Sequence, residues 1–159
     1  MIILGIDPGT ATTGFGVIER SKNYLECLDY GTIQTSPSAS TPERLKILDN
    51  KLNKIIEKHK PDILAVENIY FFKNLKTALP VSQAKGVILL AAAKKNIKVV
   101  ELTPLQVKMG VTGYGRAEKK QIQKIIQYLL RLKELPKPDD AADALATAVC
   151  CGKGLDRPF

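Results

Sequence analysis

Apolar residues recur along the chain at two different spacings, and these spacings divide it into predicted strands and helices. Residues 2–6 form a continuous apolar run rich in Ile, which predicts a strand buried on both faces. Residues 14–19 and 24–35 are predicted to form two further strands, joined by a turn at 21–23. Because the connections are short, we expect the three strands to form an antiparallel meander.

Helical spacing begins after the Ser- and Pro-rich segment 36–41. Pro42 stands at a predicted first helical position, since its ring suits the start of a helix. The apolar residues that follow at helical intervals are Leu45, Leu48, Leu52, Ile55 and Ile56. A short apolar strand is predicted over 63–66, a second helix over about 76–95 and a fifth strand over 99–102.

The last third of the chain is punctuated by Gly and Pro. Residues 103–115 carry one Pro and three Gly, which predicts a loop or a broken helix that can change shape. An amphipathic helix is expected from Ala117, and an Ala-rich final helix is expected to open at 139–143. The whole pattern predicts one α/β domain over 1–159, with a five-stranded mixed sheet and helices on both of its faces.

Four carboxylates stand where such a fold would bring them together. Asp7 ends the first strand and Glu67 ends the fourth, and ligands bind in open sheets of this kind outside the carboxyl ends of the strands. Asp140 and Asp143 are spaced i and i+3, so they project from one face of the final helix. Four converging acids are costly unless a cation compensates them. Oxygen ligands without a His or Cys cluster favour Mg²⁺ or Mn²⁺ over zinc.

Each acid taken alone also has an ordinary structural role. Asp7 precedes Pro8-Gly9 and could simply start a turn. Asp140 is favourable near the positive end of the helix dipole. Asp139 is a good helix N-cap, and we assign it that structural role. The functional interpretation of the other four rests on their occurring together.

Composition limits the classes of binding partner and the cellular compartments that we expect for this protein. The chain has 24 Lys and Arg against 16 Asp and Glu, a net charge of +8, which favours a polyanionic partner. Its three Cys and one His make no zinc pattern, which fits a reducing compartment. Because Asp7 comes too early for a signal peptide, and the longest apolar run, 87–93, is too short to cross a bilayer, we expect a cytoplasmic protein without membrane contact.

Four segments, in this order, carry a resemblance to a known family. They are Gly-Ile-Asp-Pro-Gly at 5–9, Val-Glu-Asn-Ile-Tyr at 66–70, Gly-Tyr-Gly-Arg-Ala-Glu-Lys at 113–119 and Asp-Ala-Ala-Asp-Ala-Leu-Ala at 140–146. They resemble the motifs of the RuvC family of Holliday-junction resolvases, and the predicted order of elements is similar to the RNase H-like fold of that superfamily. The resemblance implies that Asp7, Glu67, Asp140 and Asp143 are catalytic and bind metal.

By the same resemblance, the reaction is the symmetric cutting of four-way DNA junctions in homologous recombination and DNA repair. Two Mg²⁺ or Mn²⁺ ions per site would support in-line hydrolysis. The expected products are 5′-phosphate and 3′-hydroxyl ends. The family also implies a homodimer and work beside a branch-migration helicase complex.

Basic and aromatic residues near the acids are candidates for DNA binding. Lys119 and Lys120 stand in the first turn of a predicted helix, where cations oppose the macrodipole and therefore suggest another task. Aromatic residues after Glu67 could stack on splayed bases, although aromatic clusters more often form a core. The complete set of candidates is Tyr70, Phe71, Lys73, Lys76, Lys108, Arg116, Lys119 and Lys120.

Two rival functions are compatible with the same sequence. Another RNase H-like nuclease, such as an enzyme that processes ribosomal RNA, would share the short fold and an early Asp-Pro-Gly. A non-catalytic junction-binding module is less compatible with four acids, since DNA binding alone favours basic residues. The role of Gly86, inside a predicted helix, is equally open: it could serve helix packing within one chain or between the subunits of a dimer.

Overall fold

The computed structural model describes residues 1–22, 24–68 and 75–154, without the side chains of 75–77. Its centre is a five-stranded sheet in the order β3-β2-β1-β4-β5. The strands are β1 (Ile2–Asp7), β2 (Thr12–Arg20), β3 (Leu25–Gln34), β4 (Ile63–Glu67) and β5 (Lys98–Leu102). The first three pair antiparallel, whereas β4 pairs parallel with β1 and β5 parallel with β4. The predicted mixed sheet is confirmed.

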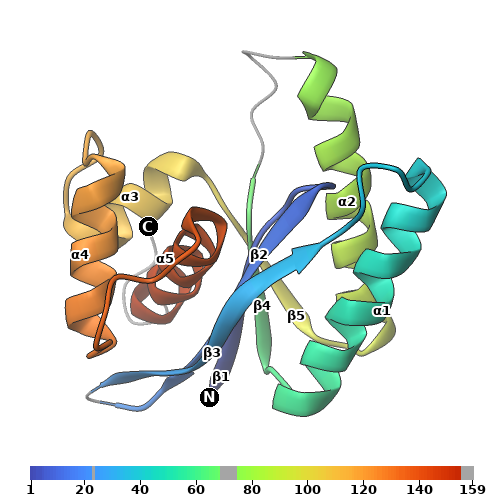
Figure 1. Ribbon diagram of the computed structural model, residues 1–159. Helices are drawn as coiled ribbons and strands as arrows, with labels where there is room; N and C mark the ends of the chain where they lie inside the picture. Colours follow the sequence, from blue (N-terminus) through green and yellow to red (C-terminus); the bar gives the residue numbers. More distant parts are fainter. Residues whose placement is uncertain (23, 69–74, 155–159) are drawn as a thin grey trace.

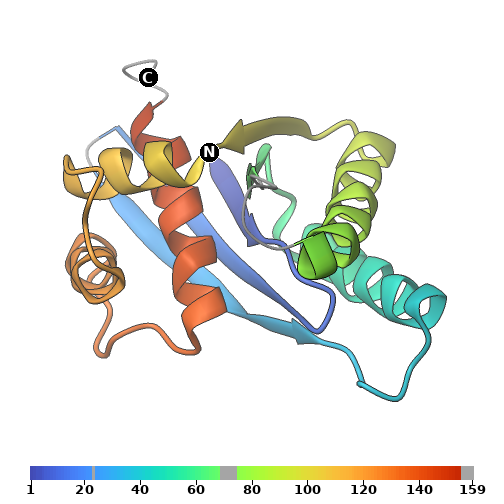
Figure 2. The same ribbon diagram turned by 90° about the horizontal axis from the view of Figure 1, so that it is seen from above.

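Helices cover both faces of this sheet (Figure 1). On one face lie α1 (Thr41–His59) and α2 (Leu75–Lys94), which pack through aliphatic residues such as Leu52 and Ile88. On the other lie α3 (Pro104–Thr112), α4 (Lys119–Leu129) and α5 (Asp139–Gly154). Seen from above, α5 lies directly against the sheet and α4 outside α5 (Figure 2). The described residues contain no helix that is long and apolar enough to cross a membrane.

The strand β1 is buried on both sides because it lies in the middle of the sheet, and its side chains alternate between the two cores. Leu4 and Ile6 belong to the core under α1 and α2. Ile3 belongs to the core under α5. Asp7 therefore points to the α5 side, and this alternation decides where the first acid is presented.

The segment 103–115 differs from the prediction of a loop or a broken helix. It contains the regular helix α3, which begins after a capping box: the Thr103 amide donates to Gln106 Oε1 at 2.8 Å, and the Gln106 amide donates to the Thr103 hydroxyl at 3.1 Å. Pro104 suits the first turn, and Gly113, with φ of 74°, ends the helix in a left-handed conformation. The Pro and Gly are therefore the start and stop signals of a helix.

Candidate active site

The first two acids stand side by side at one edge of the sheet. Asp7 is the last residue of β1 and Glu67 the last of β4. These strands are parallel and pair Ile6 with Val66, so the two acids follow next to each other. Ile6 and Val66 both pack under α1 and α2, and alternation directs Asp7 and Glu67 to the opposite side, toward α5.

The other two acids come from the first turns of α5, and glycines on the sheet allow this helix to approach closely. Gly14 pairs with Asp7 across β1 and β2. A Cβ atom at Gly14 would overlap the Asp140 carbonyl oxygen, and one at Gly5 would overlap the Ala144 carbonyl oxygen. The start of α5 therefore rests directly on the backbone beside Asp7.

Burial and the placement of the four acids on one face together raise the pKa of Asp7. Burial raises it from the ordinary value of 3.8 to about 7, and the negative charges of Asp143, Glu67 and Asp140 add to the effect in that order. Burial also raises the pKa of Glu67, with the charge of Asp143 as the next cause. The pKa of Asp143 is likewise raised by burial, although Lys119 opposes the shift. Such a cluster attracts positive charge.

Two of the predicted basic residues supply part of that charge. Lys119 Nζ lies 2.9 Å from an oxygen of Asp143 and 3.3 Å from an oxygen of Asp139. Partial burial acts to lower the pKa of Lys119, but the hydrogen bonds and charges of Asp143 and Asp139 outweigh it and raise the pKa. Lys108 on α3 acts to lower the pKa of Glu67. A pocket of about 240 Å³ is lined by Glu67, Asp143, Lys108 and Lys119 among others.

The donor set fits hard divalent cations, since it consists of carboxylate oxygens whose charges raise one another's pKa. Within residues 1–22, 24–68 and 75–154, no three or more His, Cys, Asp or Glu side chains are already arranged to hold one ion. In this arrangement Asp143 is paired with Lys119 instead. The case for a metal centre therefore rests on the chemistry and convergence of the acids.

The remaining candidates for DNA binding divide into two groups. Arg116, which precedes α4, and Lys120, in its first turn, are both exposed. Tyr70, Phe71 and Lys73 lie outside the described residues, as does the side chain of Lys76, whose backbone is in α2. Arg116 and Lys120 lie near Lys119 in the sequence, and the predictions for the aromatic residues and for these two cations stay predictions.

Asp139 has a different role from the predicted N-cap. The helix α5 begins at Asp139 itself, and the Ala142 amide donates to the Pro138 carbonyl, so the cap position falls on Pro138. The exposed carboxylate of Asp139 instead accepts a hydrogen bond of 3.0 Å from Gln123 Nε2 and pairs with Lys119. Asp139 therefore joins α5 to α4 beside the site.

Sequence reasoning did not identify Gly14 as a residue on which the site depends. It places α5, and through α5 the carboxylates of Asp140 and Asp143. The pairing of β1 with β2 contains a signal for this role. Gly5 pairs with Gly16, Gly14 pairs with Asp7, and all three glycines face α5. Glycine in strand interiors often marks such a close backbone approach.

Comparison with known proteins identifies the family to which this chain belongs. The model of the family described as crossover junction endodeoxyribonuclease RuvC matches residues 3–151. The chain belongs to the RuvC family. RuvC of Petrotoga mobilis is 55% identical over 152 residues, which are 96% of this chain and 93% of that protein. RuvC of Fusobacterium nucleatum is 54% identical over 149 residues, or 94% of this chain and 78% of that protein.

Solved RuvC structures share the fold. Thermus thermophilus RuvC in complex with Holliday junction substrate matches with a TM-score of 0.91 and 28% identity, over 99% of this chain and 97% of that one. A second T. thermophilus RuvC structure matches with a TM-score of 0.90 and 30% identity, over 98% and 96%. The RNase H-like fold and the RuvC resemblance predicted from the sequence are thereby confirmed.

Proposed function

We propose that this protein is a metal-dependent endodeoxyribonuclease that resolves Holliday junctions by cutting two opposed strands symmetrically. The observation that carries the proposal is the convergence of Asp7, Glu67, Asp140 and Asp143 at one edge of the sheet in a chain of the RuvC family. The relatives named crossover junction endodeoxyribonuclease, and the T. thermophilus structure with a junction substrate, support this choice of substrate.

In this proposal the four carboxylates hold two Mg²⁺ or Mn²⁺ ions. When bound, such ions supply Lewis acidity for in-line attack of water on a phosphodiester. The expected products have 5′-phosphate and 3′-hydroxyl ends. Asp7 must give up its proton before it can bind a cation, and its raised pKa couples that step to pH near neutrality.

The surrounding cations bind the DNA backbone. Burial raises the pKa values of Glu67 and Asp143, whereas Lys108 acts to lower that of Glu67 and Lys119 acts to lower both. These effects support a contact between the two lysines and the phosphate that is cut. Arg116, just before α4, and Lys120, in its first turn, are exposed and would contact flanking phosphates. An acidic site on a basic protein can thus receive a polyanion.

A homodimer is part of the proposal, and the outer face of α2 supports it. Leu79 is 66% exposed and Leu90 is 53% exposed, and helical spacing puts them on one face with Gly86 between them. A Cβ atom at Gly86 would have no neighbour within 4 Å, so packing within one chain does not explain this glycine. Two copies joined through this face would present two sites to the two strands of one junction.

The remaining partner proposals rest on the family alone. We place the protein in the cytoplasm, beside a branch-migration helicase complex that moves the junction. No residue of this chain is assigned to that contact.

The test is cleavage of a synthetic four-way junction with labelled strands in Mg²⁺ or Mn²⁺. We expect paired nicks at symmetric positions, and religation of the nicks by a DNA ligase would verify the end chemistry. A bound junction that stays intact with both ions would contradict the proposal. Cleavage of structured RNA without junction cleavage would instead favour an RNA-processing nuclease.

A further inference from the structure

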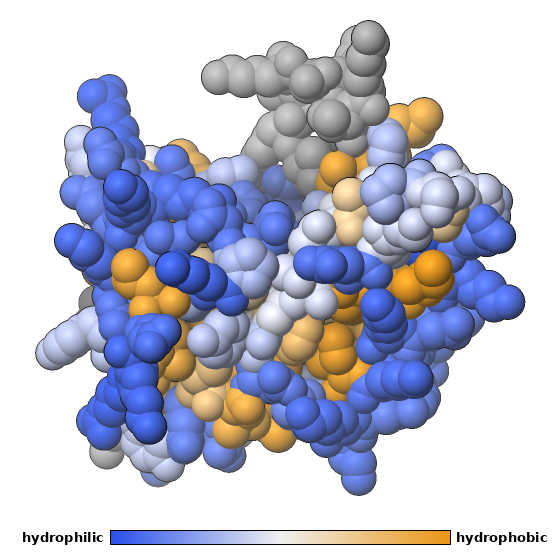
Figure 3. Space-filling model, viewed as in Figure 1, coloured by the Kyte–Doolittle hydropathy of each residue, from blue (hydrophilic) through white to orange (hydrophobic). Residues whose placement is uncertain are grey.

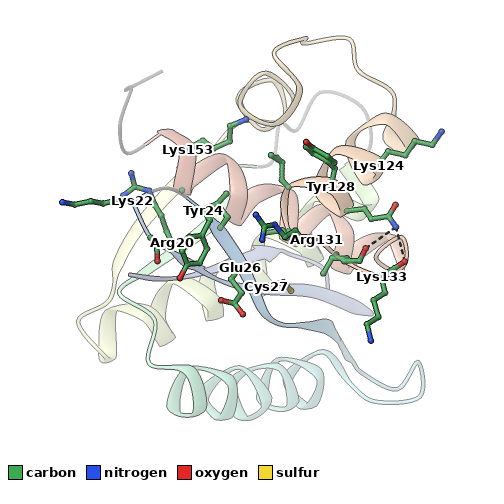
Figure 4. A pocket seen from close by; sticks show the side chains of 17 residues that line it. Arg20, Lys22, Tyr24, Glu26, Cys27, Lys124, Tyr128, Arg131, Lys133 and Lys153 are labelled. Carbon is green, nitrogen blue, oxygen red and sulfur yellow. Dashed lines mark hydrogen bonds between the residues drawn. The ribbon is translucent and has the colours of Figure 1, made fainter.

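A groove lies away from the acids, on another part of the described surface. It has a volume of about 1200 Å³ and is formed by the β2–β3 hairpin, the second half of α4 with the residues after it, and the end of α5 (Figure 4). Arg20 lines it at the far end of β2, whereas Gly14 marks the position of the acids on the same strand. Six strand residues span about 20 Å, so the groove is separate from the active site.

The charge of the groove is strongly positive. Of its 17 lining residues six are Lys or Arg, against 24 in the 159 residues of the whole chain, and Glu26 is the acidic member. Four exposed lysines come from all three elements: Lys22, Lys124, Lys133 and Lys153. In the part of the chain that the structure describes, no ion pair joins any of these four lysines to a carboxylate. This excess of cations suits a polyanion.

Two exposed tyrosines and an apolar floor add a second chemistry. Tyr24 on the hairpin is 54% exposed and Tyr128 on α4 is 82% exposed, although burial would stabilise both rings. Leu25, Leu129 and Leu132, which also line the groove, are half-buried. Figure 3 shows hydrophobic areas bordered by hydrophilic side chains on the face of the molecule that is seen in Figure 1. Hydrogen bonds from Gln127 Nε2 to the carbonyls of Leu132 and Lys133 hold the wall beyond α4 (Figure 4).

We propose that this groove binds single-stranded nucleic acid. Lysines would neutralise its phosphates while Tyr24 and Tyr128 stack on unpaired bases, which is how proteins hold single strands without reading their sequence. A duplex offers its phosphates but not the faces of its bases, so the exposed tyrosines favour a single strand. Since the groove is remote from the acids, it would hold a strand other than the one being cut.

The experiment measures anisotropy of a fluorescent dT12 oligonucleotide with the full protein in EDTA. The variant Tyr24→Ala/Tyr128→Ala should bind at least about tenfold more weakly, and Lys22→Gln/Lys124→Gln should reduce the salt dependence of binding. The matched control Lys46→Gln/Lys54→Gln, which changes two exposed lysines of α1, should bind within twofold of the original protein. Junction cleavage by the groove variants would be measured separately, so the two proposals can fail independently.

Unchanged dT12 binding by the tyrosine variant would overturn the inference. So would equal losses in the groove and control lysine variants, because they would reflect net charge alone. If poly-glutamate binds the original protein but not the groove lysine variant, while dT12 binding is unaffected by both groove variants, the groove recognises an acidic protein segment and the inference is wrong.

A different observation concerns the strand end that carries Glu67. The side chain of Lys85 on α2 is only 13% exposed, and its Nζ donates to Asn68 Oδ1 at 2.8 Å and to Glu101 Oε2. The Asn68 amide donates to the Leu102 carbonyl at 2.7 Å. Both the backbone and the side chain of the residue after Glu67 are therefore fixed.

Resting on the proposed nuclease function, we infer that Lys85 is a positioning residue for Glu67. The ammonium group of Lys85 on α2 is held by two acceptors and in turn fixes Asn68. Asn68 follows Glu67 directly, so its position sets the direction in which the Glu67 carboxylate leaves β4. Because Gly86 is the next residue, the same turn of α2 links the proposed dimer face to the active site. Small displacements of catalytic groups have large effects on rate.

Single-turnover cleavage and junction binding separate this role from a purely structural one. Lys85→Met should reduce the cleavage rate about tenfold or more while junction affinity stays within twofold, and Lys85→Arg should restore most of the rate. Asn68→Ala should reproduce the loss, which keeps the inference testable if Lys85→Met folds poorly. Normal cleavage by both Lys85→Met and Asn68→Ala would overturn it. A failure of the original protein to cut would instead contradict the proposed function.

Discussion

The helices on the two faces of the sheet approach it in different ways. On one face, α5 lies so close to β1 and β2 that Gly5 and Gly14 have no room for a Cβ atom. On the other, α1 and α2 stand off the sheet on ordinary aliphatic side chains such as Leu52 and Ile88. The close approach brings the carboxylates of α5 to the ends of two strands. The aliphatic layer under α1 and α2 forms a hydrophobic core that carries no candidate catalytic group.

The two sides of the sheet therefore contribute differently: the α5 side carries the candidate active site, and the α1 and α2 side contributes mainly to stability. The α5 side gathers buried like charges, which cost free energy in the absence of a cation. The α1 and α2 side buries apolar residues and leaves one face of α2 exposed, where we propose that a second copy binds. Variants on the two sides should therefore differ in which property they change.

The largest difference in cleavage activity is expected between substitutions of an acid on the α5 side and of an acid on α1. Asp7→Asn removes a proposed metal ligand and should reduce junction cleavage roughly a thousandfold or more, as removal of catalytic groups does in other enzymes. Junction binding should persist, because Asp7 is not a phosphate contact. The control is Glu57→Gln on α1, whose side chain is 63% exposed and pairs with Lys95. Full cleavage by Asp7→Asn would refute the assignment.

The next contrast compares the cleavage activity of two destabilised variants, one at a glycine under α5 and one at a leucine of α1. Gly14→Ala forces α5 away from the sheet and should cost about 1 to 3 kcal/mol of unfolding free energy. Leu52→Ala leaves a cavity and should cost about 2 to 5 kcal/mol. Urea unfolding gives these values, and cleavage is then measured where both variants are folded. Only Gly14→Ala should lose activity there, by about a hundredfold; equal losses would mean that the distance of α5 is unimportant.

The third prediction concerns pH and the buried charge of Asp7. Because the folded pKa is raised from 3.8 to about 7, the folded state holds this proton more tightly, and its stability falls as pH rises between these values. In EDTA at pH 8, Asp7→Asn should therefore raise the unfolding free energy by roughly 1 to 4 kcal/mol. Below about pH 4 the gain should vanish. A gain that is constant with pH would show that charge is not its cause.

The smallest effect is expected at Gly86, which provides the opposite case to Gly14. Gly86→Ala meets no atom within 4 Å of the new Cβ and should stabilise the single chain by about 0.5 to 1 kcal/mol through helix propensity. Thermal unfolding at low protein concentration measures this gain. Sedimentation at high concentration should show weaker self-association. A loss of stability in the dilute protein would place Gly86 in a packing contact within one chain.

Much of the architecture was predictable because each strand carries its own signal. The apolar run at 2–6 is part of β1, the run at 63–66 is part of β4, and the acids that follow them end those strands. The order of elements then brings parallel strand ends together. Capping residues were harder to interpret: Thr103 and Gln106 form a capping box, yet the Pro and Gly around them favoured a loop.

The sequence by itself determined which residues are acidic, where the strands end and, through its motifs, that the chain is of the RuvC kind. Only the tertiary structure decided how close α5 lies to β1, and therefore that Asp140 and Asp143 influence the pKa of Asp7 on the same face of the sheet. It also decided that Asp139 pairs with Lys119 instead of capping a helix. The physical reason is that periodicity reports which face of an element is buried, whereas the distance between two faces depends on the side chains that both present.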